Sequence, residues 1–494
     1  MYFLGYDIGS SSVKAALLEA SSNTTIASAQ FPKTEMSMIA HQPGWAEQNP
    51  EDWWNALQEV TREILETTQI DSKEITAIGI SYQMHGLVVV DENQEVLRPS
   101  IIWCDSRAVE IGDQAHQDLG VAHCQDHLLN SPGNFTASKL AWVKENEPEV
   151  FKRISKFMLP GDFIAMKLSS KPQTTISGLS EGIFYNFKEE RPSQKLLELY
   201  GIPEDYIAEI VPTFGDQSEV SQEAAMILGL NPGTKITYRA GDQPNNALSL
   251  NVLKPGELAA TAGTSGVIYG ITDALKSDAA SRVNSFAHVN HSQSERKLGI
   301  LLCINGTGIM YSWANKNLSV GSYEEMNDLA SVIPVGSEGL IVLPFGNGAE
   351  RILENKNLGA QIEGLELNIH TKSHILRAIQ EGIACSMRYG TDIMKEMGVT
   401  PTVLRAGKAN LFQSPLFRQA LANLVNATIE LYDTDGAAGA ARGAGIGLGY
   451  YTEETAFDGL QILERITPNE DQEAYEILYR NWKAQLNSKL KHHS

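Results

Sequence analysis

The residue that most directly suggests chemistry is Asp242, which lies in a stretch from Thr237 to Ala247. The stretch predicts a buried strand that ends at Gly241 and Asp242 and passes at once into a helix, because Pro244 favours a first helical turn. Since α/β proteins place reacting groups at the carboxyl ends of strands, Asp242 is a candidate reacting carboxylate. Asp is also a common N-cap residue, which satisfies orphan backbone donors without chemistry. Taken alone, the stretch favours the cap.

A turn of small residues near the start of the chain is a candidate anion-binding site. Gly9, Ser10, Ser11 and Ser12 separate two apolar runs and predict the tip of a β-hairpin. Small residues let backbone N–H groups approach an anion closely, and Lys14 adds a positive charge. Asp7 would repel that anion unless a divalent cation lay between them. A hairpin without a ligand is the structural alternative.

The same pattern recurs roughly half a chain later. An apolar strand from Glu257, a turn at Gly263, Thr264 and Ser265, and a second apolar run predict another hairpin. Two similar hairpins, one opening each half, suggest a duplicated domain with a cleft that could hold a nucleoside triphosphate. The sequence contains no G-x-x-x-x-G-K-[ST] motif, which argues against a Walker-type fold.

Polar residues follow the strand predicted from Ile75 to Tyr82. Gln83, Met84 and His85 lie at its exit, where such residues line ligand crevices. A single histidine in this position is more often a hydrogen-bonded structural residue.

Trp103, Asp105 and Arg107 lie within five positions of one another. One apolar platform beside charged hydrogen-bonding groups suits a polyol. The alternative is a surface salt bridge between Asp105 and Arg107, and the three residues alone favour it.

Length and composition bound the architecture and the partners. A chain of 494 residues is too long for one ordinary core and predicts two large domains or a core with insertions. The formal net charge of -21 argues against a nucleic-acid or membrane partner. The four cysteines are widely spaced and no apolar run reaches membrane-spanning length, so we expect a cytoplasmic protein. The oligomeric state stays open, with a homodimer as one option.

Glycines in an Ala/Gly-rich helix, predicted after Asp435 and running to about Gly449, superficially match a dinucleotide fingerprint. That fingerprint opens a helix directly after a strand, whereas these glycines lie well inside one. Tight helix packing is the better interpretation.

Five motifs together resemble a known family in order and spacing: Asp7-x-Gly-Ser-Ser-Ser-x-Lys14, Gln83-Met-His-Gly86, Leu97-Arg-Pro-x-Ile-x-Trp103-x-Asp-x-Arg107, Gly241-Asp242 and Gly263-Thr-Ser-Gly266. On these motifs the chain is similar, over nearly its whole length, to the FGGY carbohydrate kinases. The resemblance implies an α/β fold of two duplicated, actin-like (ribonuclease H-like) domains that flank a catalytic cleft. Residues 1–247 would form the sugar-binding domain and residues 248–494 the ATP-binding domain.

The resemblance also implies roles for the residues at the matching positions. Asp242 would be the catalytic base, and Asp7 would act near Mg²⁺ and the γ-phosphate of ATP. Met84 and His85 would contact the sugar, with Gln83, Trp103 and Asp105 nearby. The nucleotide contacts would come from Gly9, Ser10, Ser11, Ser12, Lys14, Gly263, Thr264, Ser265, Gly407 and Asn410.

Within that family, Tyr82 to Gly86 has the form found in kinases of xylulose, whereas glycerol kinases resemble Asn-Gln-Arg-Glu-Thr there. The implied reaction is ATP-dependent phosphorylation of D-xylulose to D-xylulose 5-phosphate. A kinase of another ketose or polyol, such as ribulose or glycerol, is an alternative, and an actin-like or chaperone-like ATPase switch is another. Two stretches depart from the family pattern: Lys408 lies in a turn where relatives have three glycines, and no proline follows Glu350 and Arg351.

Overall fold

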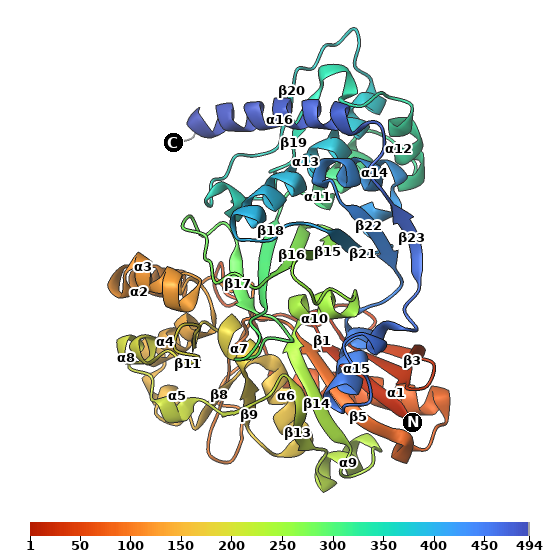
Figure 1. Cartoon of the computed structure of the whole chain (residues 1–494). Coiled ribbons are helices and arrows are strands. Elements are labelled where there is room, and N and C mark those ends of the chain that lie inside the picture. Colours follow the sequence, from red (N-terminus) through yellow and green to blue (C-terminus); the bar gives the residue numbers. More distant parts are fainter. Residues whose placement is uncertain (493–494) are drawn as a thin grey trace.

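A computed structural model describes residues 1–492 and contains two large sheets (Figure 1). The first sheet has six strands in the order β13-β14-β5-β1-β2-β3. These strands are β1 (Tyr2–Ile8), β2 (Val13–Glu19), β3 (Thr24–Phe31), β5 (Ile75–Tyr82), β13 (Phe214–Glu219) and β14 (Lys235–Gly241). The helices α1 (Pro50–Thr68), α6 (Pro160–Ser169) and α9 (Gln222–Leu228) pack together beside this sheet. We call the part built on it the first lobe.

The second sheet has seven strands in the order β17-β18-β16-β15-β21-β22-β23. These strands are β15 (Glu257–Ala262), β16 (Gly266–Thr272), β17 (Asn284–Ala287), β18 (Leu298–Ile304), β21 (Val403–Gly407), β22 (Thr428–Tyr432) and β23 (Ile462–Ile466). The apolar core on one side of it includes residues of α11 (Gly308–Asn317), α12 (Tyr323–Ser331), α13 (Lys372–Glu396), α14 (Pro415–Val425) and α16 (Gln472–His492). We call this part the second lobe.

The two sheets repeat one topology. In the first, β1, β2 and β3 are antiparallel neighbours, β1, β5 and β14 are parallel, and β13 is antiparallel to β14. In the second, β15, β16 and β18 correspond to the antiparallel strands, β15, β21 and β22 to the parallel ones, and β23 to β13. The predicted duplication and the two-lobed α/β fold are therefore confirmed.

The helices that follow the corresponding strands β14 and β22 cross between the lobes. After β14, α10 (Asp242–Ser249) contributes Ala247 to a small core with Ala259 and Tyr269 of the second sheet. After β22, α15 (Gly436–Gly447) returns to cover the first sheet, and in Figure 1 it lies in blue beside β1, β5 and β14. The boundary at residues 247 and 248 falls inside α10, and it stays a prediction.

Tight packing of the Ala/Gly-rich helix is confirmed. A Cβ atom at Gly439 would lie 2.6 Å from Cβ of Ser249 on α10, and one at Gly443 would lie 2.5 Å from the Tyr238 ring on β14. A glycine of the first sheet also allows α15 to come close, because a Cβ at Gly5 would lie 2.0 Å from the Ala437 carbonyl oxygen. The small residues of α15 thus allow α10, α15 and the first sheet to meet at the junction of the lobes.

A mostly helical segment is inserted between β5 and β13. It includes α2 (Val109–Leu119), α4 (Thr136–Asn146), α7 (Ile176–Glu181) and α8 (Gln194–Tyr200), which share an apolar cluster with Phe286 and Ala287 of β17. Ser180 of α7 accepts a hydrogen bond from the Ala287 amide at 2.9 Å. The insertion therefore joins the first lobe to the edge of the second sheet.

Candidate active site

Asp7 lies on β1 beside the central parallel strand of the first sheet. Its register partner on β5 is Ser81, whose hydroxyl donates to Asp7 Oδ1 at 2.8 Å. On the other side, Lys14 of β2 lies directly opposite Asp7, an arrangement that places the two charges together. Burial raises the pKa of Asp7, while Ser81 and Lys14 lower it. Gly436, the first residue of α15, packs so closely that a Cβ there would lie 2.4 Å from Asp7 Oδ2.

Asp242 begins α10 at the carboxyl end of β14, next to β5. The N-cap of this helix is Gly241, so Asp242 is its first residue rather than its cap, and backbone amides of Asp242 and Gln243 hydrogen-bond to the Asp242 carboxylate. Burial, together with the negative charge of Asp7, raises the pKa of Asp242 to about 7, although hydrogen bonds from the Gln243 and Asp242 amides lower it. The structure thus brings the two predicted carboxylates into one electrostatic cluster, from strands on either side of β5.

The first turn is fixed by hydrogen bonds to its carbonyl groups. The Gly9 amide donates to the Ser12 carbonyl at 3.0 Å, the Gln48 side chain donates to the Ser10 carbonyl at 2.6 Å, and the Met36 amide donates to the Ser11 carbonyl at 2.8 Å. In a trans peptide the N–H points away from the C=O of the same unit. The amides of Ser11 and Ser12 therefore point away from these partners.

The second turn rests on the start of α11. The amides of Gly308 and Ile309 donate to the carbonyls of Gly263 and Thr264 at 3.0 and 3.1 Å, and the Thr307 hydroxyl donates to the Thr264 carbonyl at 3.2 Å. By the same geometry the amides of Thr264 and Ser265 point away from the helix. Sequence reasoning missed Thr307 and Gln48, because neither belongs to a turn that the motifs mark.

Asn410 reaches the second turn, whereas Gly407, at the end of β21, faces open space. A Cβ at Gly263 would lie 3.5 Å from Asn410 Nδ2, whereas a Cβ at Gly407 would meet no atom within 4 Å. Asn410 has a positive φ of 52°, a conformation that asparagine tolerates well. The structure therefore brings Asn410 together with the turn and leaves Gly407 facing open space.

His85 lies at the exit of β5 with a positive φ of 62°, which is unusual for a residue with a side chain. Burial lowers its pKa to about 3, so the ring is neutral at neutral pH. Its Nδ1 lies 3.0 Å from the Glu181 carbonyl oxygen, which only accepts, so we assign the proton to Nδ1. Nε2 is then left as a hydrogen-bond acceptor. Lys139 donates to the backbone carbonyl of His85 at 2.8 Å and holds this strained position.

Met84 and Gln83 lie on either side of that exit. Met84 is buried against the residue before the candidate base, because a Cβ at Gly241 would lie 2.6 Å from Met84 Cγ. Gln83 donates to Gln48 at 3.3 Å, and Gln48 in turn holds the first turn. Gln83 Oε1 is buried without a protein partner among residues 1–492, which leaves an acceptor near the turn.

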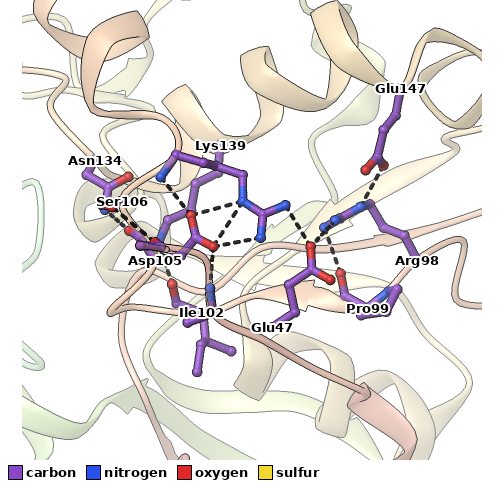
Figure 2. A network of polar contacts seen from close by, with 12 residues as sticks. Glu47, Arg98, Pro99, Ile102, Asp105, Ser106, Asn134, Lys139 and Glu147 are labelled. Atoms are coloured by element: carbon purple, nitrogen blue, oxygen red, sulfur yellow. Dashed lines mark hydrogen bonds and ion pairs between the residues drawn. The ribbon is translucent and has the colours of Figure 1, made fainter. Parts of the chain in front are cut away.

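Trp103 and Asp105 have different surroundings. The Trp103 side chain is 55% exposed, and its indole N–H donates to Ser10 Oγ at 3.3 Å, so its ring lies beside the first turn. Asp105 is fully buried, and Figure 2 shows its carboxylate inside a polar network. It accepts from the Ala46 amide at 2.6 Å and pairs with Arg107 at 2.7 Å. This geometry argues against a direct sugar contact and supports the ion pair with Arg107, although the pair is buried rather than on the surface.

Glu181 is a buried acid beside the candidate base that the sequence did not reveal. Its side chain is 1% exposed, and a Cβ at Gly241 would lie 2.5 Å from Glu181 Oε2. Burial raises its pKa well above the usual value, and the negative charges of Asp242 and Asp162 add to this effect. Burial therefore disfavours the charged form of Glu181, the acid that lies beside the start of α10.

The donor set fits a hard cation held together with phosphate oxygens. Among residues 1–492 no group of three or more His, Cys, Asp or Glu residues could hold a metal by itself. Mg²⁺ is usually bound by one or two carboxylates together with waters and phosphates. Asp7 has a carboxylate whose burial is only partly offset by Lys14 and Ser81, so it can serve as such a ligand.

Comparison with known proteins agrees with this arrangement. Residues 2–249 match the N-terminal domain, and residues 258–448 the C-terminal domain, of the FGGY family of carbohydrate kinases. The chain therefore belongs to the FGGY family and is a carbohydrate kinase, which implies ATP as phosphoryl donor and a divalent metal.

Individual relatives cover nearly the whole chain. The xylulose kinase of Bacillus subtilis is 28% identical over 460 residues, which is 91% of this chain and 89% of the relative. The gluconokinase of the same organism is 26% identical over 441 residues, 87% and 83% of the two chains. The crystal structure of a xyloylose kinase from Brucella ovis is 26% identical and superposes with a TM-score of 0.89 over 99% of both chains.

Proposed function

We propose that this carbohydrate kinase transfers the γ-phosphoryl group of ATP to a terminal hydroxyl of D-xylulose and forms D-xylulose 5-phosphate, with Asp242 as general base and Mg²⁺ at Asp7. The observation that carries the reaction is the half-buried Asp242 carboxylate at the junction of the lobes, whose pKa is raised by burial and by Asp7. The sugar rests on the form of the segment from Tyr82 to Gly86 and on the xylulose kinases among the relatives.

Asp242 would accept the proton of the attacking hydroxyl. A general base works best when its pKa lies near the working pH, and the pKa of Asp242 is about 7. In a loose phosphoryl-transfer transition state the position of the nucleophile matters more than the strength of the base. The close packing of Gly241 against Met84 fixes the start of α10, from which the Asp242 side chain extends.

His85, Gln83 and Trp103 would orient the sugar. His85 Nε2 and Gln83 Oε1 are hydrogen-bond acceptors for hydroxyl groups, and the exposed Trp103 ring offers an apolar platform beside the first turn.

Asp7 and the two turns would handle the charge of the phosphates. The Asp7 carboxylate would hold Mg²⁺, a Lewis acid that neutralises charge on the transferring group. Outward-pointing amides of Ser11, Ser12, Thr264 and Ser265 are suited to donate to phosphate oxygens.

Residues 1–492 contain no helix that is long and apolar enough to cross a membrane, and their four cysteines are free thiols. The free thiols support a reducing, cytoplasmic setting.

The test is coupled ADP release with a panel of D-xylulose, D-ribulose, L-ribulose, glycerol and D-gluconate. We expect D-xylulose to give the highest kcat/KM. A higher kcat/KM for another sugar would reassign the substrate, and ATP hydrolysis that no sugar accelerates would favour a nucleotide switch instead. D-Gluconate is the second candidate, because gluconokinases are among the relatives and Arg351, described below, has no carboxylate partner.

A further inference from the structure

A cavity of about 230 Å³ lies against β17 and β18, and none of the predicted site residues lines it. Its polar lining consists of Asn284, Cys303, Asn305, Arg351 and Asn355. Four of these five side chains are amides or a guanidinium, groups that bind oxygen-rich ligands well.

Arg351 has no counter-charge in this cavity. It donates from Nη1 to Asn284 Oδ1 at 2.7 Å, and within residues 1–492 it makes no ion pair with a carboxylate. Its neighbour Glu350 is not available, because its two oxygens accept from the amides of Asn305 and Gly306 at 2.9 and 2.8 Å. Burial lowers the pKa of Arg351. A partly buried cation that is paired with one amide oxygen and with no carboxylate among residues 1–492 indicates a place for ligand oxygens.

The cavity lies on the side of the second sheet that faces His85. Residues two apart on a strand share a face, so Asn284 and Phe286 of β17 point to the same side. The Phe286 ring lies 5.5 Å from the His85 ring, and Asn284 Nδ2 donates to Asn130 Oδ1 of the first lobe at 3.0 Å. Asn284 therefore joins Arg351 to the surface where the lobes meet.

The cavity is also next to the second turn. Cys303 of β18 pairs with Val267 of β16, the residue directly after Gly266. A sugar with its reacting hydroxyl between Asp242 and the second turn, and its middle beside His85, would extend its other end toward Arg351.

We propose that Arg351, together with Asn355, binds the oxygen atoms at the end of the sugar remote from the phosphorylated hydroxyl, and so sets which chain length and end group the enzyme accepts. This inference rests on the proposed function. Its ligand chemistry is an oxygen acceptor, which either the keto and hydroxyl oxygens of a ketose or the carboxylate of an aldonic acid can supply. The guanidinium binds a carboxylate more strongly than a neutral oxygen, so the two sources can be separated by measurement.

The experiment compares sugar KM and ATP KM for wild type, Arg351→Gln and Arg351→Lys with D-xylulose and with D-gluconate. For the substrate turned over, loss of a charged hydrogen bond is expected to raise sugar KM about 10- to 100-fold in Arg351→Gln. ATP KM should not change, and Arg351→Lys should recover part of the loss. A larger loss for D-gluconate than for D-xylulose identifies a carboxylate end group, and a similar loss for both identifies neutral oxygens.

Arg465→Gln is the matched control, since it removes the same charge from β23, at the opposite edge of the second sheet. Asn355→Gly serves if Arg351→Gln fails to fold, because Asn355 has a φ of 62° that glycine adopts without strain. It should raise sugar KM by about 2- to 10-fold. Unchanged sugar KM in Arg351→Gln and Asn355→Gly, or equal rises in sugar and ATP KM, would overturn the inference. Wild-type protein that turns over no sugar would instead contradict the proposed function.

Discussion

The two small-residue turns have the same place in the two sheets but different surroundings. The first joins β1 to β2 and the second joins β15 to β16. Two positions before the first glycine, the first turn has Asp7 and the second has Thr261. The first turn is held by Gln48 and Met36, whereas the second is held by the start of α11.

This difference shows how a duplicated fold can divide one task. The first turn combines amides with a carboxylate, so it suits a cation shared with phosphate oxygens. The second combines amides with a helix start and no acid, so it suits an anion alone. A similar contrast follows the corresponding strands β14 and β22: Asp242 after β14 is half-buried with a raised pKa, and Asp433 after β22 is exposed.

The largest expected effect comes from the two strand-end acids. Asp242→Asn keeps the shape of the side chain and removes the base, so we expect kcat to fall about 10²- to 10⁴-fold while sugar binding is kept. Asp433→Asn changes the corresponding position in the second lobe and should leave kcat unchanged. Steady-state kinetics and a sugar-binding titration on both variants measure the contrast. Equal kcat in Asp242→Asn and wild type would remove Asp242 from the mechanism.

The pH profile links Asp242 to the first turn. Because the base must be ionised, wild-type kcat/KM should be low in acid, rise through about pH 7 and level off above it. Asp7 contributes to the raised pKa of Asp242, so Asp7→Asn should move this rise to lower pH. The same variant should need more Mg²⁺ for half-maximal rate and lose about 10- to 100-fold in kcat/KM. An unmoved acid limb would show that the two carboxylates do not interact.

The sequence predicts the fold well because its signals are local and repeated. Each hairpin shows as two apolar runs around a turn of small residues, and the glycines after Asp435 show that a helix is closely approached. Burial and distant partners are not visible in that way. The family resemblance, and a set of Trp103, Asp105 and Arg107 suited to a polyol, place Asp105 near the sugar, yet folding turns the Trp103 and Asp105 side chains into different environments.

The residues that the sequence did not reveal contribute single side chains from far along the chain. Glu181 lies beside Gly241 because α7 returns to the first sheet, and Thr307 reaches the second turn because α11 begins there. Neither lies in a motif. Arg351 does have a sequence signal, as a charge at the end of the glycine-rich loop from Phe345, but nothing in that loop indicates its partner.

Adding an acid to the second turn should weaken ATP binding moderately. Thr261→Asp places a carboxylate at the position in the second turn that corresponds to Asp7. Without a cation between them, that charge repels the phosphates, so ATP KM should rise about 10-fold, with sugar KM unchanged. Thr261→Asn is the uncharged control. If Thr261→Asp binds ATP as tightly as wild type, the second turn is not the anion-binding one of the pair.

The smallest expected effect concerns the support of Asp7. Ser81→Ala removes the hydroxyl that donates to Asp7 Oδ1 and leaves the strand register intact. Since that hydrogen bond lowers the pKa of Asp7, its loss should raise this pKa and leave a larger neutral fraction in acid. The half-saturating Mg²⁺ concentration should then rise by about 2- to 10-fold, and more at pH 5.5 than at pH 8, because a raised pKa affects binding most in acid. Thr261→Ala, which removes a hydroxyl group at the position in the second lobe that corresponds to Asp7, should leave Mg²⁺ dependence unchanged at both pH values. An equal Mg²⁺ response in the two variants would contradict the division of cation and anion binding between the turns.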